Sequence, residues 1–462
     1  MGLGLAVCLL LATPAAAQQV APASPSPYQR AIAAGYKAAM LCAGMFNAGR
    51  TQAQVEATEL RGIYPEYEAI VPTLPAKIDA GAATVEVAWS EDLPPRHARW
   101  SREKGCTTLP IGAQPPATAV AVRTGRLGAD PRRWPMGDAG IAPRPSAALA
   151  GTVGKAFDAA SYGAGSATTG VVVLHRGRVV AERYADSWGP HVSNRTWSVA
   201  KSIAGTVIGR VIGTQNYVGA GMSAPIPLRP DLIAIPQWSA PGDPRRAITL
   251  DDLLRMASGL HSDTAGNRTD AVYFGGANIE DTAVLSPMVA KPGTRFRYAN
   301  NDTLLAVYAM RWAVGPERYP NVVPHLFEQL GMRHTVAEVD PRGNYILSSQ
   351  VWSTARDLAR LGQFWLQDGV WQGQRLMPAG WLRYMATPSG PQPASGPGYG
   401  ATLWLFGAKQ GLPEGSFAAQ GNRGQYVMAI PSKQLVIVRR GEDPGAARYD
   451  IGKFAADIAA SF

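Results

Sequence analysis

The order of the regular elements constrains the fold of this chain most. Two β-prone runs, Gly170 to Leu174 and Val179 to Tyr184, flank a tight turn at Gly177 and predict a hairpin. Two more strands are expected at Gln425 to Ile430 and Leu435 to Arg439, near the carboxyl end, with mostly helical patterns in between. One sheet assembled from both ends, with a helical insertion, satisfies this order. The sequence therefore predicts an α/β fold.

Three helices are marked by their caps and their apolar faces. Thr249 to Asp252 forms a capping box for a helix that runs to about Met256. Another helix is expected from Thr354 to Gln367, where three large apolar side chains share one face. A final helix is expected from about Tyr449.

The chain has 462 residues, which is more than one hydrophobic core usually supports. Prolines and glycines recur from Leu109 to Pro145, a poor background for regular structure. We place a domain boundary there, with an N-terminal extension and linker over residues 18–150 and a main domain over residues 151–462. A helix over Tyr28 to Met45 is expected in the extension.

The amino terminus has the pattern of a secretory signal. The apolar run Leu3 to Ala12 precedes the small residues Ala15, Ala16 and Ala17, which predicts a signal peptide over residues 1–17 and a secreted or periplasmic protein. The run is shorter than the roughly 20 residues that cross a bilayer, and no later apolar stretch is long enough, so no stable membrane span is expected.

Cleavage after the signal leaves Cys42 and Cys106 as the cysteines of the mature chain. Two thiols in an oxidising compartment predict one disulfide, with Cys42 on a helix and Cys106 in a loop. Two separate buried thiols are the alternative.

Composition and charge exclude several function classes. The formal charge is +10, but no basic run with interleaved aromatic residues marks a nucleic-acid site. The histidines show no metal-ligand spacing, and no Gly-x-Ser-x-Gly motif indicates α/β-hydrolase chemistry. The oligomeric state leaves no signal in the sequence.

Ser198 and Lys201 form the strongest candidate for chemistry. An apolar helical run begins at Trp197, so Ser198 lies at a helix N-terminus and Lys201, three residues later, lies on the same face. A serine hydroxyl needs a neighbouring base, and a buried lysine can serve as one. The same spacing recurs at Ser101 and Lys104, where flanking charges indicate a solvated surface segment. Further along, Tyr298 and Asn300 form a Tyr-x-Asn pair at a loop-to-helix transition.

Four stretches, in this order, carry a resemblance to a known family. They are Ser198-Val-Ala-Lys201, Asp251-Asp-Leu-Leu-Arg-Met-Ala-Ser-Gly-Leu260, Pro292-Gly-Thr-Arg-Phe-Arg-Tyr-Ala-Asn300 and Ser353-Thr-Ala-Arg-Asp-Leu-Ala-Arg-Leu-Gly362. From about Thr169 to Arg440 the chain resembles the serine β-lactamase-like hydrolases, in the branch of class C β-lactamases, esterases and 6-aminohexanoate-dimer hydrolases. The resemblance implies a β-lactamase/transpeptidase-like fold, in which helices flank an antiparallel sheet and a helical domain is inserted.

The resemblance also implies the roles of the site residues. Ser198 is expected to be the acylated nucleophile, Lys201 its base, Tyr298 the proton relay to the leaving group and Asn300 a substrate-binding amide. The Ser198 N–H is expected to form half of an oxyanion hole, a type of donor worth on the order of 3 kcal/mol. No metal or cofactor is implied.

The family's third motif, Lys or His followed by a small residue and Gly on a strand beside the site, is altered here. The best match is Gly421 to Gln425, where Asn422 and Arg423 take the first two positions; Lys409-Gln-Gly411 is a second match without a following strand. We expect Asn422, Gly424 and Gln425 to bind substrate, with the Gln425 N–H as the second oxyanion donor.

The altered motif argues against β-lactam hydrolysis. The function expected from the resemblance is an exported serine hydrolase acting on small esters or amides, without cofactors. The alternatives are a D-alanyl-D-alanine peptidase or β-lactamase, and a non-catalytic relative that binds cell-wall fragments.

Overall fold

The structure is a computed structural model of the chain, and it describes residues 24–115, 127–214, 229, 231, 235–262 and 269–462. The expected signal peptide lies outside these residues. None of the helices within them combines the length and the apolar composition that crossing a bilayer requires.

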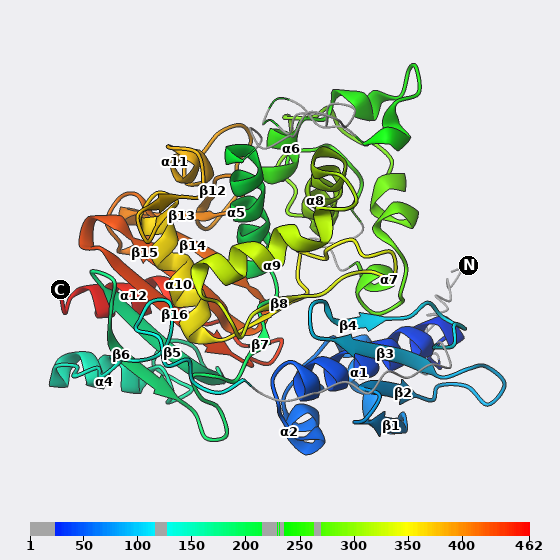
Figure 1. Cartoon of the computed structure of the whole chain (residues 1–462), viewed down its shortest axis with the longest axis horizontal. Coiled ribbons are helices and arrows are strands. Elements are labelled where there is room, and N and C mark those ends of the chain that lie inside the picture. Colours follow the sequence, from blue (N-terminus) through cyan, green and yellow to red (C-terminus); the bar gives the residue numbers. More distant parts are fainter. Residues whose placement is uncertain (1–23, 116–126, 215–228, 230, 232–234, 263–268) are drawn as a thin grey trace, which may run out of the picture.

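A seven-stranded antiparallel sheet organises the main domain (Figure 1). Its strand order is β12-β13-β14-β15-β16-β5-β6, so the first hairpin pairs with strands from the end of the chain. The strands are β5 (Thr168–His175), β6 (Arg178–Tyr184), β12 (Gly398–Tyr399), β13 (Trp404–Phe406), β14 (Ser416–Gly421), β15 (Gln425–Ile430) and β16 (Leu435–Gly441). The prediction of one sheet assembled from both ends is confirmed.

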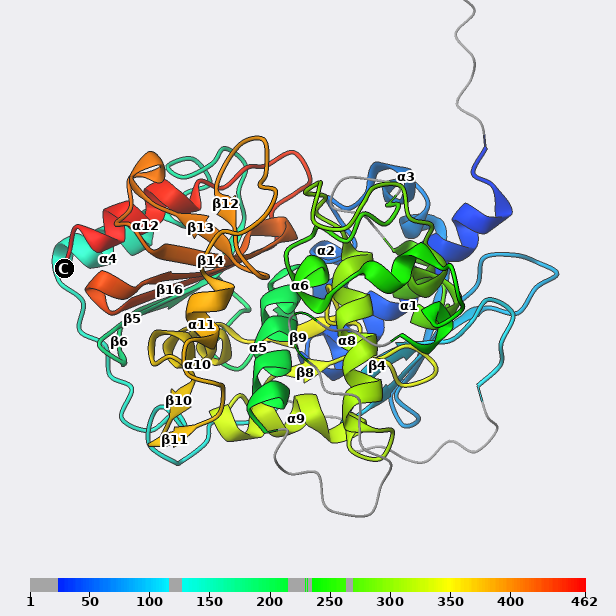
Figure 2. The ribbon, with the colours of Figure 1, turned by 90° about the horizontal axis from the view of Figure 1, so that it is seen from above.

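Helices cover both faces of this sheet because β5 and β16 are apolar on both sides, with all their residues except His175 buried. One face carries α4 (Ala147–Lys155) and α12 (Ile451–Ala459), and the other carries α5 (Val199–Gly213) and α10 (Ala355–Leu366) (Figure 2). The helix expected over Thr354 to Gln367 is α10, with Thr354 as its N-cap.

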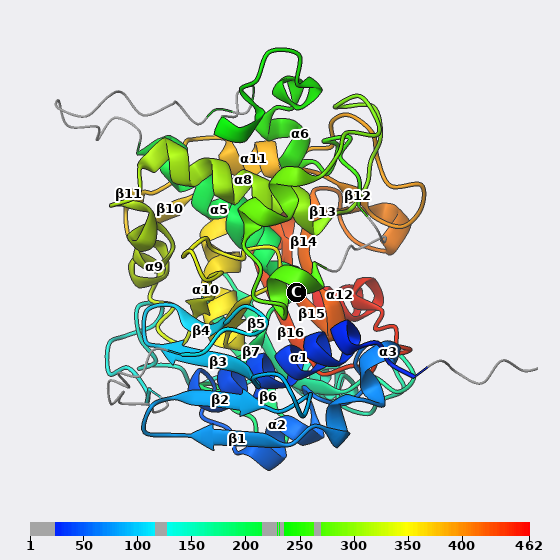
Figure 3. The ribbon, with the colours of Figure 1, turned by 90° about the vertical axis from the view of Figure 1, so that its right-hand side faces the viewer.

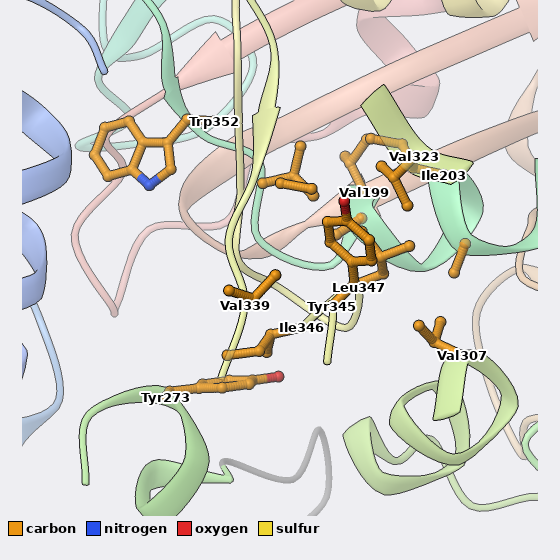
Figure 4. Close-up of a cluster of buried hydrophobic side chains, with 14 of the residues drawn as sticks. Val199, Ile203, Tyr273, Val307, Val323, Val339, Tyr345, Ile346, Leu347 and Trp352 are labelled. Atoms are coloured by element: carbon orange, nitrogen blue, oxygen red, sulfur yellow. The ribbon is translucent and has the colours of Figure 1, made fainter. Parts of the chain in front are cut away.

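The elements between β6 and β12 form the inserted helical region. Its helices are α6 (Leu250–Leu254), α7 (Asp270–Tyr273), α8 (Asn300–Val314), α9 (Tyr319–Leu330) and α11 (Trp381–Met385), and its strands are β7 (Asn194–Arg195), β8 (Val336–Ala337), β9 (Val351–Ser353), β10 (Val370–Trp371) and β11 (Gln374–Arg375). Figure 4 shows Val199 and Ile203 of α5 meeting Val307 of α8 and Val323 of α9 in the shared core. This packing fixes α5 from both sides.

The capping box at Thr249 is confirmed, but α6 ends at Leu254, two residues before the predicted end. Met256 takes a positive φ of 61°, which no helical residue adopts. The end of the helix is therefore a backbone turn that the apolar pattern does not reveal.

The extension has a sheet and helices of its own, called the N-terminal domain below, which share a hydrophobic core with the main domain and lie below it in Figure 3. Helix α1 (Pro27–Phe46) packs on a four-stranded antiparallel sheet and realises the expected helix. The other elements are α2 (Gln52–Ala57), α3 (Pro65–Glu68), β1 (Ala76–Asp79), β2 (Thr84–Val87), β3 (Arg96–Ser101) and β4 (Gly105–Thr108). The sequence patterns had not indicated this sheet, because its strands are short.

The predicted disulfide between Cys42 and Cys106 is present and joins α1 to β4. The placement of Cys106 in a loop is wrong, since it lies on β4. Gly105 begins this strand with a φ of 60°, which completes the hairpin turn after β3.

The part of the proline-rich boundary that the structure describes is seated on the main domain. Trp134 Nε1 donates to the Gly177 carbonyl at 2.8 Å, and Arg360 of α10 donates to the carbonyls of Pro135 and Gly137. Residues 130–139 therefore form a strap that lies on the main domain.

Candidate active site

The nucleophile candidate Ser198 is the N-cap residue of α5. The chain enters through β7, and the Thr196 N–H donates to the Val351 carbonyl at 2.7 Å, which fixes the start of the helix. Trp197 adopts a positive φ of 50°. This conformation is unfavourable for a large side chain, so the surrounding packing has to hold it. The Arg195 guanidinium lies 3.8 Å from the centre of the Trp197 ring system, and Tyr64 of the N-terminal domain makes an edge-on contact with it.

Lys201 lies one turn into α5 and is 1 % exposed. Its Nζ is 3.0 Å from Ser198 Oγ, 2.5 Å from Asn300 Oδ1 and 2.9 Å from the Ser348 carbonyl oxygen. Burial, aided by the charge of Arg195, lowers the pKa of Lys201 to about 7. The amine is therefore neutral in a large fraction of molecules at neutral pH, which a general base requires.

Tyr298 approaches the same hydroxyl from the loop before α8. Its phenol shares a hydrogen bond with the Ser198 side chain, and its ring centroid is 4.9 Å from Lys201 Nζ. Burial raises the pKa of Tyr298 well above its ordinary value, so the phenol stays protonated. Its ring packs against Tyr399 and Trp404, which form an aromatic wall.

Asn300 is the first residue of α8 and is 4 % exposed. Its side-chain oxygen accepts the shortest of the Lys201 contacts. The structure thus brings Ser198, Lys201, Tyr298 and Asn300 together, and it places Asn300 beside the base.

The strand beside Ser198 is β14, whose last residue is Gly421. A Cβ atom at Gly421 would lie 2.3 Å from the Thr196 carbonyl oxygen and 3.1 Å from Ser198 N, so only glycine allows this approach. The third motif of the family therefore corresponds to Ala419-Gln-Gly421 on β14, with a buried Ala419 at the position of the Lys or His. The match made from the sequence had placed the motif after Gly421, nearer to β15.

The residues after Gly421 form a turn, Asn422–Gly424, that connects β14 to β15. Asn422 is exposed at its tip. Gly424 packs over the Arg439 and Asp443 side chains, where a Cβ atom would collide with both. The Gln425 side chain is fully buried: its amide nitrogen donates to the Arg423 and Gly441 carbonyls and its oxygen accepts from Arg440. Gly424 and the Gln425 side chain therefore support the turn.

Arg423, in the same turn, anchors the N-terminal domain. Its guanidinium is 6 % exposed and donates to the main-chain carbonyls of Thr58, Arg61 and Gly62. It also forms an ion pair of 3.0 Å with Glu442. The Arg423 side chain thus points toward the N-terminal domain.

Two sequence candidates lie apart from this site. Lys409 is exposed on a short 3-10 helix, and Lys104 is exposed on the turn between β3 and β4, where its N–H donates to Ser101 Oγ at 3.3 Å. The structure supports the interpretation of the Ser101 segment as surface.

Three residues near the base were missed by the sequence. Arg195 is buried, and its Nε and Nη1 atoms have no hydrogen-bond partner among the described residues. Its charge helps to lower the pKa of Lys201. The Tyr273 hydroxyl lies 2.5 Å from Ser348 Oγ, and the Ser348 carbonyl binds Lys201. Only the position of Arg195, three residues before Ser198, left a trace in the sequence.

Ser198 thus lies within hydrogen-bond distance of a buried lysine and a partly buried tyrosine. Residues 153–452 match the family model described as Beta-lactamase. The chain belongs to the beta-lactamase family. Its structural neighbours include structures described as a β-lactamase and as a penicillin-binding protein homologue, so the expected fold class is confirmed. As a member of the family with this site, the protein is a serine hydrolase.

Several relatives of this beta-lactamase-family protein carry descriptions of activity. The 6-aminohexanoate-dimer hydrolase of Paenarthrobacter ureafaciens is 25% identical over 301 residues, 60% of this chain and 73% of that protein. A structure from Bacillus anthracis described as a 6-aminohexanoate-dimer hydrolase has 22% identity and a TM-score of 0.52, covering 64% of this chain and 78% of its own. EstCE1, a hydrolase with promiscuous acyltransferase activity, has 18% identity and a TM-score of 0.51, covering 68% and 98%.

Proposed function

We propose that the protein is an exported hydrolase that cleaves small uncharged esters or amides through an acyl-enzyme on Ser198. The observation that carries the proposal is the 3.0 Å contact between Ser198 Oγ and Lys201 Nζ, combined with a lysine pKa of about 7. A hydroxyl with an unprotonated base in reach is an activated nucleophile.

The first half-reaction follows from this geometry. Neutral Lys201 accepts the proton of Ser198 Oγ while the oxygen attacks the substrate carbonyl carbon. The Ser198 N–H stabilises the oxyanion, together with the Asn422 N–H, which follows Gly421 at the site, in place of the Gln425 N–H expected from the sequence. Tyr298 donates a proton to the leaving alkoxide or amine, and its phenolate is reprotonated from Lys201, which leaves an ester bond on Ser198.

In the second half-reaction, water attacks the acyl carbonyl. The same groups act in reverse, since Lys201 and Tyr298 remove a proton from the water and return one to Ser198 Oγ as the acid product leaves.

Uncharged substrates are supported by the wall of the site. Ala419 puts a methyl group where the family's third motif has a cation, and Arg423 is committed to the N-terminal domain. The aromatic wall of Tyr298, Tyr399 and Trp404 suits an apolar acyl or leaving group. A relative described as a 6-aminohexanoate-dimer hydrolase and one described as a hydrolase with promiscuous acyltransferase activity support amide and ester cleavage by acyl transfer, without bearing on the charge of the substrate.

The test is covalent labelling by a fluorophosphonate probe, followed by intact-mass measurement. We expect one adduct on the wild type and on Ser101→Ala, which removes the surface copy of the Ser-x-x-Lys spacing, and none on Ser198→Ala. Labelling of Ser198→Ala, or its failure on all three proteins, would overturn the proposal. Hydrolysis of p-nitrophenyl esters and short amides then ranks the substrates.

The second candidate is a D-alanyl-D-alanine peptidase or β-lactamase, supported by the family itself. Rapid turnover of nitrocefin, or stable labelling by a fluorescent penicillin, would favour it over an esterase or amidase. Binding of muropeptides without any acylation would instead favour a non-catalytic relative.

Export is part of the proposal, and the Cys42–Cys106 disulfide supports it because such bonds persist in oxidising compartments. Expression of the full chain in a bacterium should give a mature protein that lacks residues 1–17. Recovery of the protein in the cytoplasmic fraction with Met1 still present would contradict export.

A further inference from the structure

Two histidines and one aspartate meet on the side of the main domain that carries the 130–139 strap. His191 Nδ1 lies 3.2 Å from His334 Nε2 and 3.9 Å from Asp138 Oδ2. One ligand atom from each of the three side chains can be chosen so that all three lie within 4.8 Å of one another. All three side chains are partly buried, and they come from the strap, from the loop before β7 and from the loop before β8.

Ion pairs surround this cluster. Arg356 binds Glu182 at 2.6 Å, and Arg360 binds Asp357 at 2.8 Å, so each guanidinium has its own carboxylate. Asp138 is the third carboxylate beside these two cations. Arg132 and Arg333 both pair with Asp130 beside them, so the four guanidiniums and the four carboxylates of this region balance.

The two oxygens of Asp138 have different partners. Oδ1 accepts from Arg356 and Arg360 at 3.2 and 3.4 Å. Oδ2 accepts the Asp130 N–H at 2.9 Å and is the oxygen that faces His191. The guanidiniums thus orient the carboxylate and leave its second oxygen directed toward the imidazoles, as outer-shell partners do around metal ligands.

We propose that Asp138, His191 and His334 bind a divalent late transition-metal ion, with zinc the best match. Zinc bonds of roughly 2.0–2.2 Å in a tetrahedral site place neighbouring ligand atoms about 3.4 Å apart. The two nitrogens are already near that spacing, and the carboxylate reaches it by a small side-chain rotation. Two imidazoles and one carboxylate select zinc, copper or nickel over magnesium and calcium, which prefer oxygen ligands.

None of the three ligands contacts the Ser198 side chain in the contacts described above, and the ion would hold three segments of the chain together. It ties the strap, which leads from the N-terminal domain, to two loops that flank the small β7-β9-β8 sheet. The sequence spacing of 53 and 143 residues between the ligands hides this cluster from any motif search.

The experiment uses the full-length protein, stripped with a chelator and titrated with zinc chloride in a calorimeter. We expect one ion to bind per chain, with a dissociation constant of about 1 µM or tighter, and the melting temperature to rise with zinc. Cobalt substitution should give the visible absorption of a tetrahedral ion. Asp138→Asn and His334→Ala should each weaken binding by about tenfold or more.

The control is His175→Ala, which removes a histidine outside the cluster and should bind zinc like the wild type. Fluorophosphonate labelling of Ser198 in every variant shows that the variants are folded. Absence of binding in the wild type, or equal binding in Asp138→Asn and His334→Ala, would overturn the proposal and leave the cluster as a hydrogen-bonded histidine pair.

Discussion

Arg423 donates a hydrogen bond of 2.7 Å to the main-chain carbonyl oxygen of Arg61. The contact fastens the turn that follows Gly421, beside the nucleophile, to the N-terminal domain. Arg423 takes a positive φ of 56°, and Glu442 holds its guanidinium from the other side. The N-terminal domain therefore supports the wall of the active site.

Arg423→Met should weaken both the fold and the chemistry. It leaves Glu442 without its partner in a buried place, which costs about 3 kcal/mol or more in the free energy of unfolding. We also expect the acylation rate to fall at least about tenfold, with a smaller change in KM, because the turn would shift by a fraction of an ångström. Urea unfolding and stopped-flow ester cleavage measure the two effects.

Arg61→Ala is the matched control, since Arg423 contacts only the main chain of Arg61. It should unfold and react like the wild type. A normal acylation rate in Arg423→Met would show that the turn keeps its position without the N-terminal domain.

Gly421→Ala should disrupt the oxyanion hole directly. The added methyl group would lie 2.3 Å from the Thr196 carbonyl oxygen and 3.1 Å from Ser198 N, so β14 has to move away from α5. Loss of one oxyanion donor typically costs about a hundredfold in rate. Pre-steady-state acylation measures the effect, and Gly151→Ala, on α4 with open space around it, serves as the control. Equal rates in both variants would place the oxyanion hole elsewhere.

The main sheet and the helix that begins at Ser198 could be predicted because their signals are local. The apolar run after Ser198 defines α5, and the β5 and β6 pattern with Gly177 defines a hairpin. The prediction that strands from both ends of the chain share one sheet is also confirmed, and the structure pairs β5 with β16.

The third motif was misplaced because its decisive property is a close approach between two segments. Gly421 and Gly424 look alike in sequence, but only Gly421 lies against the Ser198 main chain. The contacts of Arg423 with the N-terminal domain likewise join segments far apart in the sequence, so no local pattern reveals them. The sheet β1 to β4 escaped prediction since its strands are mostly four residues long and gain their stability from α1.

Replacing Cys42 and Cys106 together by serine should destabilise the N-terminal domain. The disulfide closes a loop of 64 residues, so the chain-entropy model gives a loss on the order of 4 kcal/mol in the free energy of unfolding. Urea unfolding in the presence and absence of dithiothreitol should show the same loss in the wild type. Identical midpoints with and without reductant would mean that packing of α1 alone stabilises the domain.

The rate of acylation should follow the ionisation of Lys201. Its pKa lies at about 7, and only the neutral amine accepts the serine proton. The rate should therefore fall about tenfold per pH unit below pH 7 and level off above it.

Asn300→Asp places a carboxylate at the 2.5 Å contact with Nζ, which stabilises the ammonium ion. It should move the midpoint to higher pH by about one unit or more. Asn301→Asp adds the same charge one residue later, where the side chain contacts Ser286, and should leave the midpoint near that of the wild type. A midpoint that stays at pH 7 in Asn300→Asp would assign the titration to a group other than Lys201.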